Sequence, residues 1–397
     1  MSLNLADQAN QRMVDRMIAE GALWSRGLID AFRQTPRHRF LHHVYALQKR
    51  GEGWREIDTR EPAAQEIDLL YSDRALITRL AAGDDGRQVA VSSSSQPSLM
   101  AEMLEDLRLE AGQCVLEIGA GTGYNAALMA HVVGANLVHS VDVDRVVLAE
   151  AAEHFLGFAG RGVFLHHGDG RQGWLEAAPF DRLMVTAATP DFEPAWLEQV
   201  TDGGVLVAPV VFAPGMAFVA RGEVRHGVFC GGLTRGAYFM PLRTEEEAPH
   251  ETADVPAARV SLKTRPAPWA GWFERHRPRL GWGSFLQAIV FYGWLRGLDL
   301  LHSGGNSAYA SYGVCLGDDQ CWFSSEDWQV SGAAGQELGE ALWRAWLAAG
   351  GPWPTEFCLT AAAGALEASG SESFVRQGPR CRQVWTLKEL RPRPGWR

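Results

Sequence analysis

The spacing of hydrophobic and polar positions changes along the chain and predicts different kinds of element. Near the N-terminus, apolar side chains recur three or four residues apart, as in Met13 and Met17, then Leu28 and Phe32. This spacing is typical of amphipathic helices. We therefore expect residues 1–78 to consist mainly of helices.

From about Gln113, short apolar runs alternate with longer helical patterns. Five runs are interpreted as strands: CVLEIG, LVHSVDVD, VFLHHGD, DRLMVTAA and GVLVAPVV. Two helices are expected between them, YNAALMAHVVG and RVVLAEAAEHFLGFA. Strands alternating with helices predict a parallel sheet covered on both faces. The expected fold class is α/β, with a doubly wound, Rossmann-like domain over residues 1–243.

The alternation stops at residues 244–268, which are rich in Pro and Glu and lack periodicity, so a linker is expected. Eleven of the fifteen tryptophans lie beyond Pro268. We expect residues 269–397 to form a C-terminal α+β domain. Its expected elements are an apolar helix over 285–301, a hairpin at Gly317, a helix over 335–350 and a final strand over 382–390.

Composition and charge exclude several classes of protein. The formal net charge of -10, without a Lys/Arg-rich run, argues against nucleic-acid binding. The most apolar stretch carries Arg296 and Asp299 and is shorter than the ~20 residues of a membrane span. None of the six cysteines forms a CxxC pair, so zinc and redox motifs are not expected. No export signal is recognisable at the start, and we expect a cytoplasmic protein without membrane partners.

The segment VLEIGAGTGY combines an acidic residue with a glycine-rich turn. Glu117 ends a strand, and Gly119, Gly121 and Gly123 lead into a helix. Glycines allow the backbone to approach a ligand closely, and the helix N-terminus offers free N–H groups. Asp142 ends the next strand, where a carboxylate can bind ribose hydroxyls. These five residues are the first candidates for cofactor binding.

Three interpretations of the glycine turn compete. The dinucleotide fingerprint G-x-G-x-x-G fails because Tyr124 occupies its last position. The spacing E-x-G-x-G-x-G is instead typical of S-adenosylmethionine-dependent methyltransferases, and a turn without a ligand remains an alternative. Asp169 and Gly170 follow a later strand and extend the expected cofactor site, with Asp169 accepting a hydrogen bond from the adenine amino group. By position alone, Asp169 is more commonly a helix cap.

Five separated segments together resemble the protein-L-isoaspartate O-methyltransferase family. They are QTPRHRFL (34–41), YSDRAL (71–76), SSSSQPSLMAEML (92–104), GDGRQGWLEAAPFDRLMVTAATP (168–190) and YFMPL (238–242). The resemblance implies a class I methyltransferase domain that uses S-adenosyl-L-methionine. It also implies an enzyme, a protein or peptide carboxyl O-methyltransferase. The family esterifies the free carboxylate of isoaspartyl residues, and attack by the following amide nitrogen then closes a succinimide.

The resemblance also assigns the substrate loop. Ser95 matches the family's serine that contacts the substrate carboxylate, so it is the expected catalytic residue and also lies beside the cofactor. Ser94 and Gln96 are the expected substrate-binding neighbours. The alternative is that Ser95 only caps the helix beginning near Pro97. A carboxylate with an ordinary pKa near 3.9 is already ionised at neutral pH, so no general base is required. No metal is expected, because adjacent histidines on a strand point to opposite faces.

Departures from the family pattern shape the functional hypothesis. Ser93 and Ser94 replace Thr-Ile, residues 79–90 form an insertion, and the chain continues for over 150 residues past YFMPL. The extended form resembles a subgroup that methylates an aspartate in lanthipeptide-like ribosomal peptides. The main hypothesis is therefore a methyltransferase acting on a modified ribosomal precursor peptide, recognised by 269–397, whose ester closes to succinimide (aspartimide). The alternatives are a general L-isoaspartyl repair methyltransferase and a non-catalytic peptide-binding module. The C-terminal tryptophans either fill a core, which is the default, or line a peptide groove.

Overall fold

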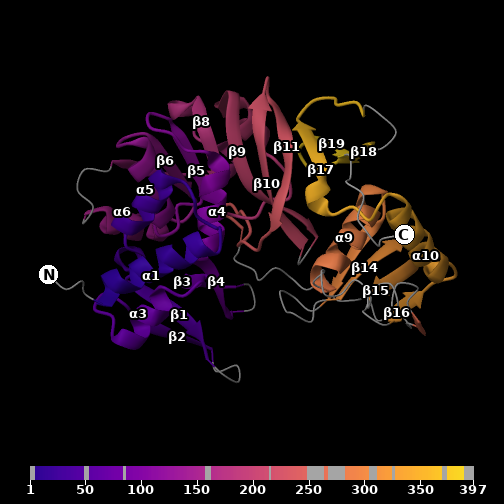
Figure 1. The fold of residues 1–397 in the computed structure, drawn as a ribbon, viewed down its shortest axis with the longest axis horizontal. Helices are drawn as coiled ribbons and strands as arrows, with labels where there is room; N and C mark the ends of the chain where they lie inside the picture. Colours follow the sequence, from indigo (N-terminus) through magenta and orange to yellow (C-terminus); the bar gives the residue numbers. More distant parts are fainter. Residues whose placement is uncertain are drawn as a thin grey trace.

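The computed structural model of the chain contains three β-sheets in the part that it describes (Figure 1). The described residues are 5–48, 53–83, 86–156, 162–213, 216–247, 263–266, 282–303, 311–323, 327–368 and 373–388. The sheets have ten, four and five strands. The largest carries the glycine turn, and the smaller sheets lie beside it (Figure 1).

The ten-stranded sheet is parallel in one half and antiparallel in the other. In order across the sheet its strands are β18 (Ser373–Gln377), β19 (Arg382–Leu387), β17 (Phe357–Ala362), β11 (Val228–Gly236), β10 (Met216–Arg225), β9 (Val200–Ala213), β8 (Phe180–Val185), β5 (Val115–Ile118), β6 (Val138–Asp142) and β7 (Val163–His167). Strands β9, β8, β5, β6 and β7 pair in parallel. This confirms the predicted alternation of strands and helices, while β10 and β11 extend the sheet with antiparallel hairpins.

Each strand of the parallel half places alternate residues on opposite faces, so neighbouring residues join different cores. Val115 packs in one core with the helices α4 (Pro97–Leu107) and α5 (Tyr124–Val133). Leu116 faces the opposite core, which holds α7 (Pro194–Gln199). Helix α6 (Arg145–Leu156) packs against β6 and β7. The doubly covered sheet expected from the sequence is therefore present.

The helices expected within residues 1–78 are present, and a sheet that the sequence pattern did not indicate lies among them. Helices α1 (Leu5–Ala19), α2 (Arg26–Gln34), η1 (Arg37–Phe40) and α3 (Ala64–Leu70) accompany an antiparallel sheet. Its order is β2 (Trp54–Asp58), β1 (His43–Leu47), β3 (Leu76–Ala82) and β4 (Gln88–Ser94). These strands pair across long stretches of sequence, as between Tyr45 and Ile77, which a local pattern cannot indicate. The insertion over 79–90 lies in the β3–β4 hairpin.

The C-terminal region forms a five-stranded sheet and returns three strands to the large one. The small sheet has the order β12 (Lys263–Pro266), β16 (Asp327–Ser331), β15 (Asp319–Phe323), β14 (Ser311–Leu316) and β13 (Asp299–Ser303), with α9 (Trp282–Leu295), α10 (Gly335–Ala348) and η6 (Pro354–Glu356) beside it. The hairpin at Gly317, the helix near 335–350 and the strand near 382–390 are confirmed. The apolar helix is shorter than the expected 285–301, because Gly297 adopts a φ of 92° and a strand comes next.

The expected division into two domains stays a prediction, with two additions from the structure. Strand β17 pairs with β11, so the C-terminal region shares the large sheet (Figure 1). Residues 263–266, placed in the expected linker, form strand β12 and pair with β16. The linker residues 248–262 lie outside the described residues.

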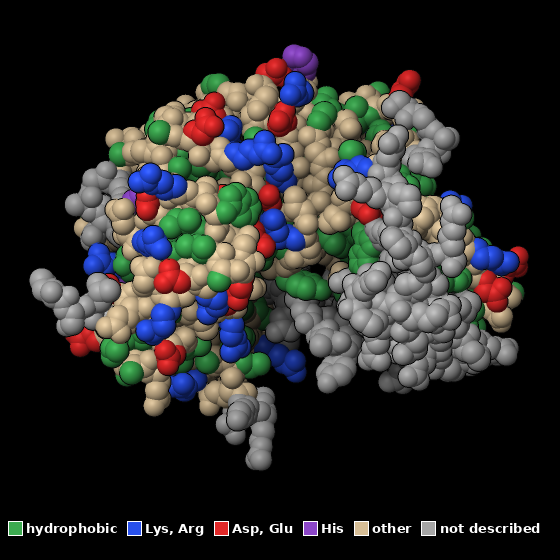
Figure 2. All heavy atoms as spheres, viewed as in Figure 1, with side chains coloured by type: hydrophobic (Ala, Val, Ile, Leu, Met, Phe, Trp, Pro, Cys, Tyr) green, Lys and Arg blue, Asp and Glu red, His purple; other side chains and the backbone are tan. Residues whose placement is uncertain are grey.

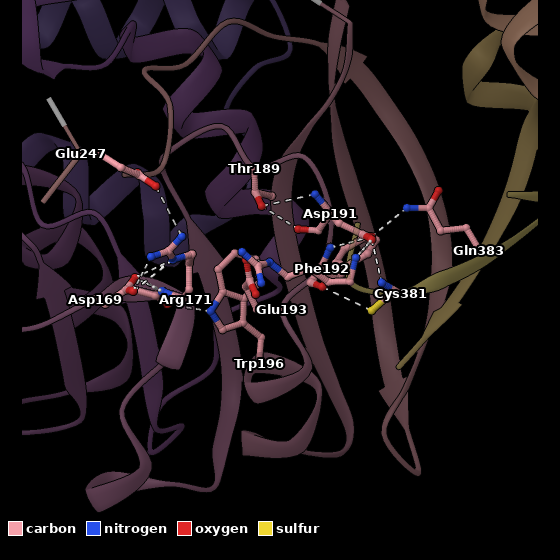
Figure 3. A network of polar contacts seen from close by, with 12 residues as sticks. Asp169, Arg171, Thr189, Asp191, Phe192, Glu193, Trp196, Glu247, Cys381 and Gln383 are labelled. Carbon is pink, nitrogen blue, oxygen red and sulfur yellow. Dashed lines mark hydrogen bonds and ion pairs between the residues drawn. The ribbon is translucent and has the colours of Figure 1, made fainter. Parts of the chain in front are cut away.

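A buried carboxylate fastens the C-terminal strands to the large sheet's core (Figure 3). Asp191, fully buried in the loop after β8, accepts hydrogen bonds from the backbone N–H groups of Arg380 at 3.0 Å and Cys381 at 2.7 Å. The Gln383 side-chain amide donates to it at 2.8 Å and the Phe192 N–H at 2.9 Å. Four donors therefore replace the water that a buried carboxylate loses.

Described tryptophans of the C-terminal segment pack inside the protein. Trp328, Trp346 and Trp385 are fully buried, and Trp385 meets Phe212 of β9 at a ring-centroid distance of 5.7 Å. These rings belong to one core that continues into the large sheet. The default interpretation is confirmed for them, and a groove lined by these rings is not supported.

The visible surface mixes charges of both signs, without a continuous basic stripe (Figure 2). No helix in the described part of the chain is long and apolar enough to cross a membrane.

Candidate active site

A cavity of about 1060 Å³ opens beyond the carboxyl ends of β5, β6 and β8. This is where open α/β sheets commonly bind ligands. The sequence-predicted site residues that line it are Ser94, Ser95, Gln96, Glu117, Gly119, Gly121, Asp142 and Gly170. Gly123 and Asp169 do not line it. The structure thus brings the substrate loop and the glycine turn into one cavity.

The three glycines of the turn have different roles. All three have positive φ, 100° at Gly119, 51° at Gly121 and 79° at Gly123. A Cβ at Gly119 would lie 2.5 Å from the Thr186 hydroxyl, which donates to the Gly119 carbonyl at 2.7 Å. A Cβ at Gly123 would lie 2.8 Å from the Phe155 ring. Gly123 therefore allows close packing beneath the turn, and its contact with a cofactor stays a prediction.

Glu117 is completely buried at the end of β5. Asn125 donates to one carboxylate oxygen at 2.7 Å and Ser140 to the other at 2.5 Å. Burial raises the pKa of Glu117 to about 7, although both hydrogen bonds act to lower it. A strongly shifted acid in a cavity wall is a candidate functional group.

Asp142 presents its carboxylate beside the glycine turn. One oxygen accepts from the Gly121 N–H at 3.1 Å and the other from the Asp144 N–H at 3.0 Å. Burial raises the pKa of Asp142 more than these hydrogen bonds lower it. A carboxylate fixed by backbone donors at the end of β6 has the position expected of a ribose-binding residue.

The substrate loop is held from outside the cavity by Arg37. The fully buried Arg37 side chain donates to the Ser94 carbonyl at 3.1 Å and to the Ser95 carbonyl at 2.8 Å. It also donates to the Ser94 hydroxyl at 3.2 Å. The Ser94 hydroxyl is thus occupied within the protein, whereas Ser95 lies in the cavity wall with no side-chain hydrogen bond to the described residues.

Helix α4 is capped by Asp73, not by Ser95. The N-cap position belongs to Gln96, and Pro97 is the first helical residue. The Asp73 carboxylate accepts from the Ser98 N–H at 2.9 Å, the Ser98 hydroxyl at 2.8 Å and the Gln96 side-chain amide at 2.8 Å. Burial acts to raise the pKa of Asp73, but these hydrogen bonds hold it below its usual value. The capping alternative for Ser95 is therefore wrong.

Asp169 has the capping role expected from its position, and its contact with adenine stays a prediction. Its carboxylate accepts from the Arg171 N–H at 3.0 Å and forms an ion pair with the Arg171 side chain at 2.8 Å (Figure 3). It is the N-cap of a short 3-10 turn, η3 (Gly170–Gln172). Gly170 does line the cavity, and its carbonyl accepts from the Trp196 indole at 2.8 Å.

The sequence pattern did not indicate the cavity residues at the end of β11 and in the segment after it. Arg235, Tyr238 and Arg243 all line the cavity, and the segment YFMPL had been noted only as a motif. The Tyr238 side chain is half exposed and hydrogen-bonds with Tyr312 and Gln287 of the C-terminal region. The C-terminal region therefore touches the cavity wall directly.

The adjacent histidines of the sequence, His42–His43 and His166–His167, contact other side chains. His166 stacks on Trp174 with ring centroids 4.0 Å apart, and His42 packs edge-on against His154 at 4.2 Å. Within the described ranges, no three His, Cys, Asp or Glu side chains form a metal-binding group.

Comparison with known proteins decides the family. A sequence profile described as protein-L-isoaspartate(D-aspartate) O-methyltransferase matches residues 70–245. A protein-L-isoaspartate O-methyltransferase of Maricaulis maris is 35% identical over 48% of this chain and 74% of its own. One of Xanthobacter autotrophicus is 44% identical over 42% of this chain and 75% of its own. The chain belongs to this family. Protein-L-isoaspartate O-methyltransferases use S-adenosyl-L-methionine to methylate carboxyl groups of isoaspartyl residues in proteins and peptides.

A solved structure named protein-L-isoaspartate O-methyltransferase shares the architecture beyond the family match. Its TM-score is 0.51 at 20% identity, and the match covers 88% of this chain and 96% of that one. Residues 1–245 are less than two thirds of this chain, so the shared fold must include much of the region beyond residue 245. The likeness in fold therefore extends into the C-terminal region of this chain.

Proposed function

We propose that this protein is an S-adenosylmethionine-dependent methyltransferase that esterifies the free carboxylate of L-isoaspartyl residues in peptides and proteins. The observation that carries the proposal is one shared cavity. Its wall combines the glycine turn and Asp142 with the loop Ser94–Gln96. Of the sequence hypotheses, the repair methyltransferase has the better support, because the relatives described above are protein-L-isoaspartate O-methyltransferases.

The donor set of the cavity fits the cofactor. Gly121 leaves room for close approach, since a Cβ there would meet only the Ser93 carbonyl at 3.6 Å. Asp142 would accept hydrogen bonds from ribose hydroxyls. Glu117 and Asp142 are acids whose pKa values are raised by burial, so a cationic ligand would stabilise their ionised forms. The cofactor supplies a methyl group activated by attachment to a positively charged sulfur.

The residues of this chain would act mainly by positioning. The substrate carboxylate is ionised at neutral pH and needs no general base. Its oxygen would bond to the methyl carbon while the methyl–sulfur bond breaks, and the bond electrons stay on sulfur. The Ser95 hydroxyl would donate a hydrogen bond to the other carboxylate oxygen. This contact would hold the attacking oxygen in line with the methyl–sulfur bond. Such alignment can contribute about 7–11 kcal/mol to catalysis.

The test is methyl transfer to a matched pair of peptides. The full-length protein is incubated with labelled S-adenosylmethionine and a peptide containing L-isoaspartate, or the same peptide with ordinary aspartate. We expect methyl ester, and then succinimide formed by loss of methanol (a net loss of one water from the starting peptide), only from the isoaspartyl peptide. Equal methylation of both, or of neither despite cofactor binding, would refute the proposal.

The narrower hypothesis of a modified ribosomal precursor peptide as substrate stays a prediction. It relied on the C-terminal extension, and the likeness in fold to the solved structure extends into that region. The same assay addresses it, because a tailoring enzyme would methylate an ordinary aspartate in its own peptide. Cofactor binding would exclude the third hypothesis, a non-catalytic peptide-binding module.

A further inference from the structure

We infer that Arg37 is a positioning residue of the methyl-transfer site: it turns the carbonyls of Ser94 and Ser95 away from the cavity, so that two backbone N–H groups face the substrate carboxylate. The inference rests on the proposed function, because that carboxylate is the methyl acceptor.

Arg37 joins three separated segments through one guanidinium group. Its side chain is 0% exposed and makes six hydrogen bonds. The acceptors are the carbonyls of Leu70, Ser72, Arg74, Ser94 and Ser95 and the hydroxyl of Ser94. The planar fork of arginine can serve several carbonyls at fixed angles, which lysine cannot do. The geometry of the substrate loop therefore depends on this side chain.

The direction of the two serine carbonyls determines where the next N–H groups point. In a trans peptide the C=O and N–H bonds point in opposite directions. Both carbonyls point toward the same Arg37 nitrogen, Nη2, so the N–H groups of Ser95 and Gln96 point away from it. Ser95 and Gln96 line the cavity, whereas Arg37 does not. Successive N–H groups on one side form a concavity that binds anions.

The N–H groups and the buried charge are both available for an anion. Neither N–H donates a hydrogen bond to another group in the described part of the chain. Burial lowers the pKa of Arg37 to about 10, so the group remains a cation at neutral pH. No carboxylate among the described residues lies within ion-pair distance of it, although the charge of Asp73 is near enough to act to raise its pKa. A carboxylate on the cavity side of the loop would meet two donors with a positive charge behind them.

The first experiment compares Arg37→Lys with Arg39→Met by NMR on the full-length protein with S-adenosylhomocysteine. Arg39 lies on the same short helix, is exposed and makes no hydrogen bond or ion pair with the loop among the described residues, so it is a matched control. We expect the Ser95 and Gln96 amide signals to shift or broaden in R37K and stay in place in R39M. In the wild type, an isoaspartyl peptide should move both signals downfield. Unchanged signals in both comparisons would overturn the inference.

The second experiment measures steady-state kinetics of the same variants with the isoaspartyl peptide. We expect R37K to lose at least tenfold in kcat/KM while its affinity for S-adenosylmethionine stays within twofold, and R39M to match the wild type. A merely structural Arg37 would lower cofactor affinity and thermal stability in parallel with activity, which would overturn the inference. If R37K does not fold, the titration of the wild-type protein with isoaspartyl peptide, followed through the Ser95 and Gln96 amide signals, decides the inference. If the wild type methylates no isoaspartyl peptide, the proposed function fails, and the comparison of free variants still decides the role of Arg37.

Discussion

Ser95 does not cap a helix, so its substitution tests the proposed contact with the substrate carboxylate. The helix behind it is capped by Asp73, so replacing Ser95 removes no cap. We predict that Ser95→Ala lowers kcat/KM for the isoaspartyl peptide at least tenfold, because a hydrogen bond to a charged group contributes about 1.5–3 kcal/mol. Urea unfolding should show stability unchanged within about 0.5 kcal/mol. Full activity in this variant would remove Ser95 from the site.

Glu117 should make the stability of the protein depend on pH. Its pKa is raised from 4.5 to about 7 in the folded state, so the folded protein holds this proton more tightly than the unfolded chain. The contribution is fully present below pH 4.5 and is lost as pH rises through 7. Between pH 5 and 8 the wild type should lose about 2 kcal/mol relative to Glu117→Gln, measured by urea unfolding. Parallel pH profiles of the two proteins would contradict this.

Some site residues could be predicted from local sequence motifs. Others could not, because contacts between distant segments bring them to the site. Glu117 and Asp142 lie at the ends of β5 and β6, and Gly121 lies in the turn after β5, so their spacing in one βαβ pattern placed them together. Arg37 contacts Ser95 across 58 residues of sequence, and no local pattern indicates such a partner. The sequence feature that could have indicated this contact is the presence of three family-like segments, 34–41, 71–76 and 92–104, which meet at Arg37.

Helix α4 has an N-terminus that depends on a distant residue. Asp73 lies just after α3 and accepts the first free N–H of α4, that of Ser98. We predict that Asp73→Ala destabilises the protein by about 0.5–2 kcal/mol, as loss of a helix cap does. It should also lower kcat/KM, because Gln96 loses its anchor. The control Asp30→Ala removes an exposed ion pair with Arg26 and should change stability by less than about 0.5 kcal/mol. Urea unfolding and kinetics of both variants give the comparison.

Helices and strands could be predicted where the sequence pattern was local. They could not be predicted where pairing with a distant strand determines the conformation. Strands β5 to β8 are short runs bounded by turns, and the helix α5 begins after Gly123 and ends at Gly134. Strand β4 ends in Ser92–Ser94, which has little intrinsic preference for a strand. It is a strand because β3 pairs with it, Leu76 opposite Ser94. The same pairing delivers the substrate loop to the cavity.

On the scale of the whole molecule, Asp191 connects the C-terminal strands to the methyltransferase core (Figure 3). Asp191→Ala would leave the N–H groups of Arg380 and Cys381 and the Gln383 amide without an acceptor. We predict a loss of about 3 kcal/mol or more, since each unsatisfied buried donor costs about 1–3 kcal/mol. The exposed control, Asp202→Ala, should lose less than about 1 kcal/mol. Calorimetric unfolding showing equal losses would contradict this role.

The same contacts show why truncation near Thr244 is a poor test of substrate recognition. It would remove β17 from the edge of β11, and Trp385 from the ring cluster around Phe212. Lost activity would then reflect lost stability. Substitution of Tyr238, which hydrogen-bonds with Tyr312 and Gln287, would change the cavity wall with less structural disturbance than the truncation.

The central claim is that one cavity holds the methyl donor at Asp142 and the acceptor carboxylate at Ser95. The most direct measurement is a crystal structure of the full-length protein with S-adenosylhomocysteine and an isoaspartyl peptide. We predict the ribose hydroxyls within hydrogen-bond distance of Asp142. The isoaspartyl carboxylate should accept from the Ser95 hydroxyl and from the N–H groups of Ser95 and Gln96. A carboxylate bound elsewhere, or a nucleoside away from Asp142, would contradict the account.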